Sequence, residues 1–110
     1  MRQAKVYFKG EEAGLLTQHD DGSFTYRYHD LWIADSSKPP ISLTLPKTKP
    51  EYQADYLFPS FYNMLPEGTN KQVVCKHLRI DENDYFGLLI NTARYDTIGA
   101  VTVKKIQEVL

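Results

Sequence analysis

The residues best suited to chemistry in this 110-residue sequence are few and widely spaced. Its three histidines are far apart in the sequence: His19, His29 and His77. Zinc sites usually take their ligands at short helical or turn spacings, so this pattern predicts no zinc site. Cys75, the single cysteine, has no CxxC partner and follows Val73 and Val74, which favours a packed thiol over a nucleophile.

Two polar motifs have both a chemical and a structural interpretation. His29-Asp30 has the residue types of a general base and the carboxylate that orients it. An adjacent pair is weak evidence for catalysis, so a polar pair at a strand end is the favoured interpretation. Asp20-Asp21-Gly22 lacks the spaced ligands of a calcium loop, and Asp-Gly predicts a hairpin turn instead.

The sequence contains no phosphate-binding motif. Its six glycines are scattered and form neither GxGxxG nor GxxxxGKS/T. The catalytic-loop and DFG motifs of protein kinases are missing as well. We therefore expect no ATP site, no metal, no cofactor and no enzymatic activity in this chain.

Composition argues against nucleic acid as a partner. Thirteen Lys and Arg face fourteen Asp and Glu, for a formal charge of −1, so no strong field attracts polyanions. Eight tyrosines and five phenylalanines keep single-stranded nucleic acid as an alternative, because bases stack on aromatic rings. Such binding normally needs a basic groove, and the charges here are interspersed.

Nothing in the sequence indicates a membrane or secretion. No apolar run is long enough to span a bilayer. The N-terminus, MRQAKVYFKG, carries charges and lacks the apolar stretch of a signal peptide. The single cysteine suits a reducing compartment. We expect a cytoplasmic protein with no membrane contact.

The first half of the sequence has the period of β-strands. Val6 and Phe8 alternate with polar residues, residues 13–18 follow a turn at 10–11, and residues 24–28 alternate after the Asp-Gly turn. Residues 29–35 fit one helical turn or a bulged corner. We expect an antiparallel meander over 4–28, a fourth strand at 41–45, and loops at 36–40 and 47–53.

After residue 55 the period becomes helical. One helical stripe, with Pro59 in its first turn, contains Phe58, Phe61, Tyr62 and Leu65. Thr69 with Gln72 indicates the capping box of a second helix, and Asp81 is the expected cap of a third. Apolar β character returns at 98–103. These elements predict an α+β fold, with one domain over residues 1–110. Its sheet is an antiparallel meander or mixed sheet of N-terminal strands plus a C-terminal strand, packed with about three short helices.

The most distinctive segment is FYNMLPEG at residues 61–68, which we call the corner. Met64 and Leu65 lie at the end of an amphipathic helix, directly before a Pro-Glu-Gly turn. In the structural interpretation Pro66 stops the helix and Gly68 supplies a positive φ. In the functional interpretation the apolar side chains are held outward on a rigid turn that binds a partner.

Several motifs, in order, resemble the HipA N-terminal subdomain family. That family typically has a phenylalanine followed by Leu-Leu-Pro-Glu-Gly, which stands here as Phe61 and then Met64-Leu65-Pro66-Glu67-Gly68. Residues 84–89 (DYFGLL) resemble its Asp-x-Phe-x-Leu-Leu helix, and 96–101 (DTIGAV) resemble its Asp-x-x-Gly-Ala strand start. Further matches cover nearly the whole chain, at residues 6–7, 14–15, 24–26 and 42–46.

The resemblance implies a protein that binds a kinase. In the family this subdomain normally precedes a serine/threonine kinase toxin core, and HipB represses the operon. The sequence stops at Leu110, so we expect a free-standing version similar to HipS, the antitoxin of tripartite HipBST systems. The implied partners are a HipT-like serine/threonine kinase and a HipB-like DNA-binding repressor in a ternary complex, without direct nucleic-acid contact.

The kinase-binding residues implied by this resemblance lie in the corner and at the single tryptophan: Tyr62, Asn63, Met64, Leu65, Pro66, Glu67 and Trp32. Phe61 and Tyr62 would brace the corner from the core side, while Met64 and Leu65 offer apolar contact. Glu67 would cap a helix or pair with a kinase cation. Some HipS-like proteins have a tryptophan at this corner, whereas this sequence has none between residues 60 and 68. Substituting Met64 and Leu65 by Asp should then abolish neutralisation without unfolding the domain.

Other interpretations stay open. Trp32 fits ordinary core packing as well as an interface. The chain could be a structural subunit that stabilises a kinase–repressor complex without neutralising it, or a small nucleic-acid-binding domain. A hydrolase using His29-Asp30 would need a nucleophile, and the sequence identifies none. Docking beside the ATP cleft could block substrate access or hold the kinase inactive, and the sequence does not choose between them.

Overall fold

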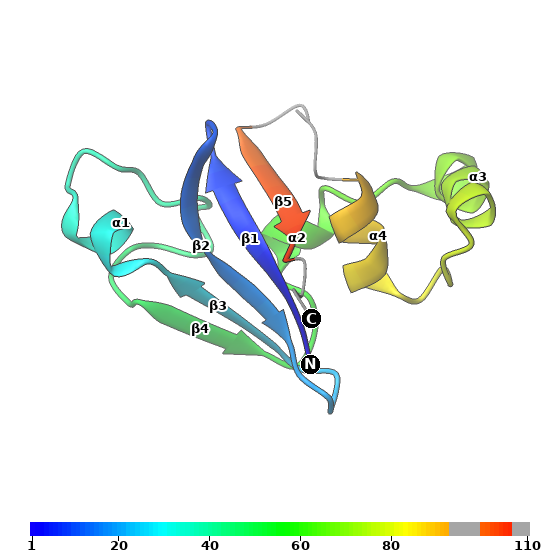
Figure 1. The fold of residues 1–110 in the computed structure, drawn as a ribbon, viewed down its shortest axis with the longest axis horizontal. Helices are drawn as coiled ribbons and strands as arrows, with labels where there is room; N and C mark the ends of the chain where they lie inside the picture. The colour runs from blue at the N-terminus through cyan, green and yellow to red at the C-terminus, as the bar shows by residue number, and fades with distance from the viewer. Residues whose placement is uncertain (93–99, 107–110) are drawn as a thin grey trace.

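A five-stranded sheet organises the fold. The computed structural model describes residues 1–92 and 100–106. All four strand pairings are antiparallel, in the order β4-β3-β2-β1-β5 (Figure 1). The elements in chain order are β1 (Arg2–Phe8), β2 (Glu11–Gln18), β3 (Phe24–Tyr28), α1 (Asp30–Ala34), β4 (Glu51–Ala54), α2 (Pro59–Tyr62), α3 (Gly68–Leu78), α4 (Tyr85–Thr92) and β5 (Val101–Lys105). The predicted α+β class is confirmed.

The first three strands form the predicted meander, because the turns between them contain residues with left-handed backbone. Lys9 and Gly10 have φ values of 49° and 83° in the β1–β2 turn. Gly22 has a φ of 90° in the β2–β3 turn. Asp21 stabilises that turn by accepting a 2.9 Å hydrogen bond from the Ser23 N–H. The C-terminal strand β5 rejoins the sheet beside β1, as predicted, while its expected start at residue 98 lies outside the described residues.

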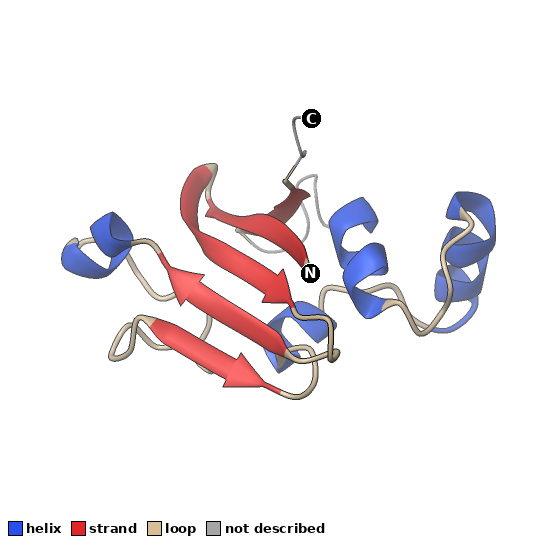
Figure 2. Ribbon diagram, turned by 60° about the horizontal axis from the view of Figure 1, so that its bottom comes forward, coloured by secondary structure: helices blue, strands red, loops and turns tan. Residues whose placement is uncertain are grey.

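One face of the sheet forms the core. Its fully buried members are Ala4, Val6, Leu16, Tyr26, Tyr28 and Val103. Two helices pack against this face (Figure 2). Phe61 of α2 lies 5.8 Å from Tyr26, and Phe86 of α4 stacks on Phe24 at 6.5 Å. Burial of each large apolar side chain contributes about 1.5–3 kcal/mol, so this layer supplies much of the folding free energy.

The predicted fourth strand is in the wrong place. Residues 41–45 form bends and turns. In a strand, Ile41, Leu43 and Leu45 would share one face, but Ile41 and Leu45 are 8% and 1% exposed whereas Leu43 is 96% exposed. The Tyr28 hydroxyl fixes this loop by donating to the Leu45 carbonyl and accepting from the Ile41 N–H at 3.0 Å. The fourth strand is instead β4, which pairs with β3 and overlaps the expected loop at 47–53.

The described residues contain four helices. α1 occupies the segment for which a helical turn or a bulged corner was expected. α2 ends at Tyr62 rather than near residue 65, with Pro59 in its first turn as predicted. α3 begins at Gly68, with Glu67 as its N-cap residue. In Figures 1 and 2, α3 lies beyond α4, at the end of the molecule away from the sheet.

Two predicted helix caps are wrong. Thr69 lies inside α3, and no side chain caps the start of that helix. Asp81 accepts a hydrogen bond from the Asn83 N–H at 2.8 Å in the turn before α4. Asp84 is the actual cap of α4, since the Gly87 N–H donates to Asp84 Oδ1 at 3.0 Å. Two aspartates so close in sequence give the same capping signal, and only the position of the first helical turn distinguishes them.

Candidate functional site

The corner is held in place from inside. Phe61 is 1% exposed, and its ring centroid lies 5.8 Å from Tyr26 and 6.3 Å from Phe58. Leu65 is 8% exposed and belongs to the same buried cluster. The backbone turns tightly between them, because the Leu65 N–H donates to the Tyr62 carbonyl at 3.1 Å. The corner is therefore a turn anchored by two buried side chains.

Other side chains of the corner project from this base. The exposed ones are Tyr62, Asn63 and Glu67. Met64 and Pro66 are half-buried, with Met64 packed against the core. Tyr62 is 46% exposed, so it lies on the outer side instead of bracing the corner from within. The expectation that Leu65 offers apolar surface in the free protein is wrong, and the Glu67 side chain does not cap α3.

Trp32 lies in a different part of the molecule. It is 5% exposed, its indole N–H donates to the Pro39 carbonyl at 2.9 Å, and its ring meets Phe8 edge to face at 6.0 Å. In Figure 1, α1 with Trp32 lies at the opposite end of the molecule from α3, which follows the corner in the chain. Of the two interpretations open for Trp32, the burial of its side chain supports core packing.

A hollow of about 430 Å³ opens beside the corner. Its lining includes three tyrosines, Tyr56, Tyr62 and Tyr85, and two aspartates, Asp21 and Asp55. Tyr56 is 83% exposed, and the rings of Tyr62 and Tyr85 meet edge to face at 5.6 Å. We call this site the tyrosine hollow. The sequence alone does not indicate Tyr56, Tyr85 or Asp55 as site residues, because these residues come together only through the fold.

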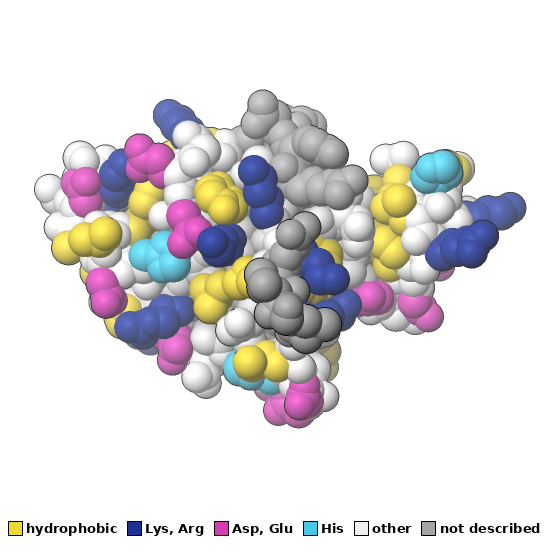
Figure 3. All heavy atoms as spheres, in the orientation of Figure 1, with side chains coloured by type: hydrophobic (Ala, Val, Ile, Leu, Met, Phe, Trp, Pro, Cys, Tyr) yellow, Lys and Arg dark blue, Asp and Glu magenta, His cyan; other side chains and the backbone are white. Residues whose placement is uncertain are grey.

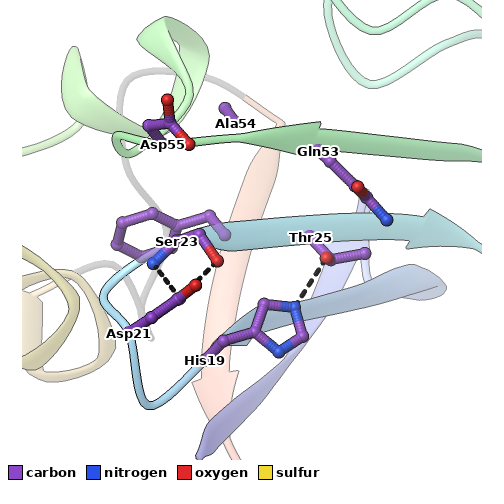
Figure 4. Close-up of a pocket in the computed structure, with 8 residues that line it drawn as sticks. His19, Asp21, Ser23, Thr25, Gln53, Ala54 and Asp55 are labelled. Carbon is purple, nitrogen blue, oxygen red and sulfur yellow. Dashed lines mark hydrogen bonds between the residues drawn. The ribbon is translucent and has the colours of Figure 1, made fainter.

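A second, polar hollow of about 370 Å³ shares Asp21 and Asp55 with the first (Figure 4). His19 Nε2 lies 2.7 Å from Thr25 Oγ1, whereas Asp21 accepts from the Ser23 hydroxyl at 2.6 Å and from its N–H at 2.9 Å. The hydrogen bonds from Ser23 hold the pKa of the Asp21 carboxyl below its ordinary value. The histidine and the aspartate engage different hydroxyls, so they do not form a nucleophile–base–carboxylate chain.

His29 and Asp30 do not form the base and orienting carboxylate considered for the sequence. His29 Nε2 contacts the Glu12 carboxylate, whereas Asp30 Oδ1 lies 3.6 Å from Arg27 Nη2. Burial raises the pKa of Glu12, but Lys5 and His29 together outweigh burial and hold that pKa below its ordinary value. No serine, threonine or cysteine is among the described residues lining the hollow beside His29, so the hydrolase interpretation gains no nucleophile.

The structure gives little support to a nucleic-acid site on the sheet tyrosines. Tyr26 and Tyr28 are fully buried and cannot stack on bases. Over the sheet, Lys and Arg side chains lie beside Asp and Glu (Figure 3). In residues 1–92 and 100–106, no cluster of three or more His, Cys, Asp or Glu side chains is placed to hold a metal ion. No helix in this part of the chain is long and apolar enough to cross a bilayer.

Comparison with known proteins identifies the family. The family model described as the HipA N-terminal domain matches residues 4–104. The chain belongs to this family. The solved structure described as the N-terminal domain of HipA toxin has a TM-score of 0.72 and 31% identity, covering 99% of this chain and 96% of that chain.

The HipA N-terminal domain occurs in relatives of very different length. A protein of Haemophilus influenzae is 34% identical over 105 residues, which are 96% of this chain and 93% of that protein. The Sinorhizobium fredii protein named "Putative kinase Y4mE" is 28% identical over 89 residues, which are 81% of this chain but only 21% of that protein. One relative is thus little more than this domain, and the other contains a much longer remainder.

The family motif at residues 84–89 has a structural role in this HipA N-terminal domain. Phe86 and Leu88 are fully buried. Asp84 caps α4 and also accepts hydrogen bonds from Arg2 of β1 at 2.6 and 3.2 Å. Those bonds hold the pKa of the Asp84 carboxyl below its ordinary value, although burial acts in the opposite direction. The motif therefore joins the first strand to α4, while residues 96–99 of the next motif lie outside the described residues.

Proposed function

We propose that this chain is an antitoxin-like subunit that binds a HipT-like serine/threonine kinase and neutralises it. Residues 1–110 would act as one docking domain, placed next to the active-site cleft of the kinase. The observation that carries this proposal is the match of 99% of the chain, at 31% identity, to the N-terminal domain of HipA toxin. The proposed complex is cytoplasmic and includes a HipB-like DNA-binding repressor as its third member.

The relatives support a kinase as the partner. In "Putative kinase Y4mE" the matching segment accounts for 21% of the protein, so the domain there is joined to a long remainder. The Haemophilus influenzae relative, matched over 93% of its length, supports a version that works as a separate subunit. Domains that share a chain normally pack through a defined interface, and a separate subunit would need the same kind of surface.

The corner is the proposed contact with the kinase. Tyr62, Asn63 and Glu67 are exposed on a turn whose backbone is fixed by buried neighbours. A preordered turn loses little conformational entropy on binding, and tyrosine is a frequent interface anchor. Met64 and Pro66 add half-buried apolar surface. In this proposal Leu65 anchors the corner in the core, and Trp32 contributes only by packing α1 against the core.

The two modes of neutralisation have different effects on ATP binding and phosphorylation by the kinase. A subunit that blocks access of the protein substrate lowers substrate phosphorylation but leaves ATP binding to the kinase intact. A subunit that holds the kinase inactive also reduces its ATP affinity or its autophosphorylation. Measuring both quantities in the purified complex therefore distinguishes the two modes.

Co-expression with a HipT-like serine/threonine kinase tests the proposal. Growth and kinase autophosphorylation are measured with and without this chain, and we expect rescue of growth and a stable complex. The double variant Tyr62→Ala, Asn63→Arg should weaken both, because both side chains are exposed. Leu31→Arg is the matched control, since Leu31 is 86% exposed on the distant helix α1. Circular dichroism checks that each variant is folded.

The results separate the remaining functions. A stable complex with full kinase activity would support a structural subunit and refute neutralisation. Failure to bind the kinase at all would refute both interpretations. Salt-dependent binding to single-stranded nucleic acid would then be the alternative to measure. Neutralisation that survives in the folded double variant would refute the corner as the contact.

A further inference from the structure

The tyrosine hollow contains two carboxylates without ion-pair partners in the described part of the chain. None of the described residues that line it is Lys or Arg. Ser23 donates two hydrogen bonds to the Asp21 carboxylate, and among the described residues neither Asp21 nor Asp55 forms an ion pair. Neighbouring acids are compensated: Asp20 contacts the N-terminal ammonium and Asp84 contacts Arg2. The hollow therefore has a local negative charge that the overall composition does not reveal.

The tyrosine rings that line the hollow are suited to binding a cation. The negative face of a tyrosine ring attracts ammonium and guanidinium groups within about 6 Å of the ring centroid. Lys71 Nζ of this chain already lies 5.3 Å over the Tyr85 ring. Tyr56 and Tyr62 are more exposed, and no Lys or Arg among residues 1–92 and 100–106 lies over either ring. Two exposed rings and two carboxylates thus surround one hollow.

We infer that the tyrosine hollow receives a Lys or Arg side chain from a basic segment of the kinase partner. This inference rests on the proposed function and adds the chemistry of one contact. A cation in the hollow gains attraction from the rings and from both carboxylates. Asp21 and Asp55 repel an acidic or phosphorylated segment. A purely apolar segment would desolvate them without compensation. Tyr62 belongs to both the corner and the hollow, so a single partner can contact the two together.

Charge-neutral variants of the chain test the inference in the kinase complex. Asp21→Asn with Asp55→Asn should lower kinase affinity about tenfold at low salt, and the difference should shrink at high salt. The matched control, Asp30→Asn with Glu51→Gln, removes the same charge from other exposed positions and should leave affinity within about twofold of wild type. Tyr56→Leu with Tyr62→Leu keeps apolar surface but removes the ring faces, and should lower affinity about tenfold at both salt concentrations.

A peptide probe tests the hollow without the kinase. The probe is an end-blocked peptide of alternating Gly and Arg, and its counterpart has Glu in place of Arg. In ¹H–¹⁵N spectra of the full chain, the Arg peptide should shift the signals of Gly22 and of the Asn83 side chain, which line the hollow. Leu31, on α1, should not shift. The Glu peptide, or the doubly neutralised variant, should give no shifts.

The outcomes distinguish this inference from the proposed function. If the kinase binds every hollow variant as tightly as wild type, the inference is wrong and the proposed function stands. If no kinase binds but the Arg peptide shifts the hollow signals, the proposed function fails while the cation site is supported. If the variants instead reduce self-association of the chain, the hollow's occupant is a second copy and the inference is refuted. Equal shifts with both peptides would also refute it.

Discussion

The hydroxyl groups of Tyr26 and Tyr28 offer a matched pair of substitutions. Both residues are fully buried on β3, and their rings meet edge to face at 4.8 Å. The Tyr28 hydroxyl donates to the Leu45 carbonyl and accepts from the Ile41 N–H at 3.0 Å. The Tyr26 hydroxyl has no hydrogen-bond partner among the described residues. Replacing each tyrosine by phenylalanine removes a hydroxyl group from two neighbouring buried sites. At one site that hydroxyl is hydrogen-bonded, and at the other it is not.

The expected losses in the free energy of unfolding differ, because only one substitution leaves other buried polar groups without a hydrogen-bond partner. Tyr28→Phe leaves the N–H of Ile41 and the carbonyl of Leu45 without their partner, in residues that are 8% and 1% exposed. A buried unsatisfied donor or acceptor costs roughly 1–3 kcal/mol, so Tyr28→Phe should lower the free energy of unfolding by about 2–4 kcal/mol. Tyr26→Phe removes a hydroxyl that is itself unsatisfied, so the free energy of unfolding should change by less than about 1 kcal/mol or rise.

Urea unfolding followed by far-UV circular dichroism measures both variants. The slope m should match that of wild type, so that a shift in the midpoint reports stability. In a domain of this size, the Tm of Tyr28→Phe should lie about 10 °C or more below that of Tyr26→Phe. Equal losses in the two variants would refute the reasoning, because ring packing or a buried water at Tyr26 would then outweigh the assigned hydrogen bonds.

Three further predictions test other parts of the fold. Leu65→Ala should lower the free energy of unfolding by about 2–4 kcal/mol, whereas Tyr62→Ala on the same corner should cost about 1 kcal/mol or less, both measured in urea. Asp84→Asn removes a carboxylate whose pKa is depressed in the folded state. The Asp84 carboxylate therefore stabilises the fold at pH values above its unfolded pKa of about 4, and this stabilisation is lost as the pH falls through its folded-state pKa. The free energies of unfolding of the variant and of wild type should converge in acid. Gly14→Ala would place its Cβ 2.4 Å from a β3 carbonyl oxygen and 2.5 Å from the Tyr26 hydroxyl. It should cost about 3 kcal/mol or more, and a wild-type Tm would contradict this.

Strands could be predicted where alternation and turn chemistry agree. The strands β1, β2 and β3 have both, with Gly10 and Gly22 in the turns. The apolar alternation at 41–45 is misleading, because that loop reaches into the core at its two ends while Leu43 between them is exposed. The strand β4 is four residues long, too short for a clear pattern. Its position depends on long-range contacts such as the 2.8 Å hydrogen bond from the Tyr28 N–H to the Pro50 carbonyl.

The corner could be located from the sequence, but its exposed side could not. Pro66 and Gly68 indicate a break between two helices, and α2 and α3 are indeed separate, with the predicted positive φ at Gly68. The helical stripe in the sequence continues to Leu65, whereas α2 ends at Tyr62, so the directions of the later side chains do not follow the helical period. The tyrosine hollow could not be predicted, because the β2–β3 turn, the segment before α2, the end of α2 and the start of α4 form it only after folding.

The burial of the motif residues limits how this domain can bind the proposed kinase partner. Phe61, Leu65 and Phe86 are largely or fully buried, so the apolar residues of the corner and the α4 motif mainly stabilise the fold. In the proposed complex, affinity would then come from side chains that remain outside, which include Tyr56, Tyr62, the exposed polar residues of the corner and the carboxylates of the hollow. Aromatic anchors chiefly slow dissociation, whereas local charge accelerates association and makes it depend on salt. Under the proposed function, a chain with a net charge of −1 should still associate with a kinase faster at low ionic strength, because the local charge of the hollow, and not the total charge, would face the partner.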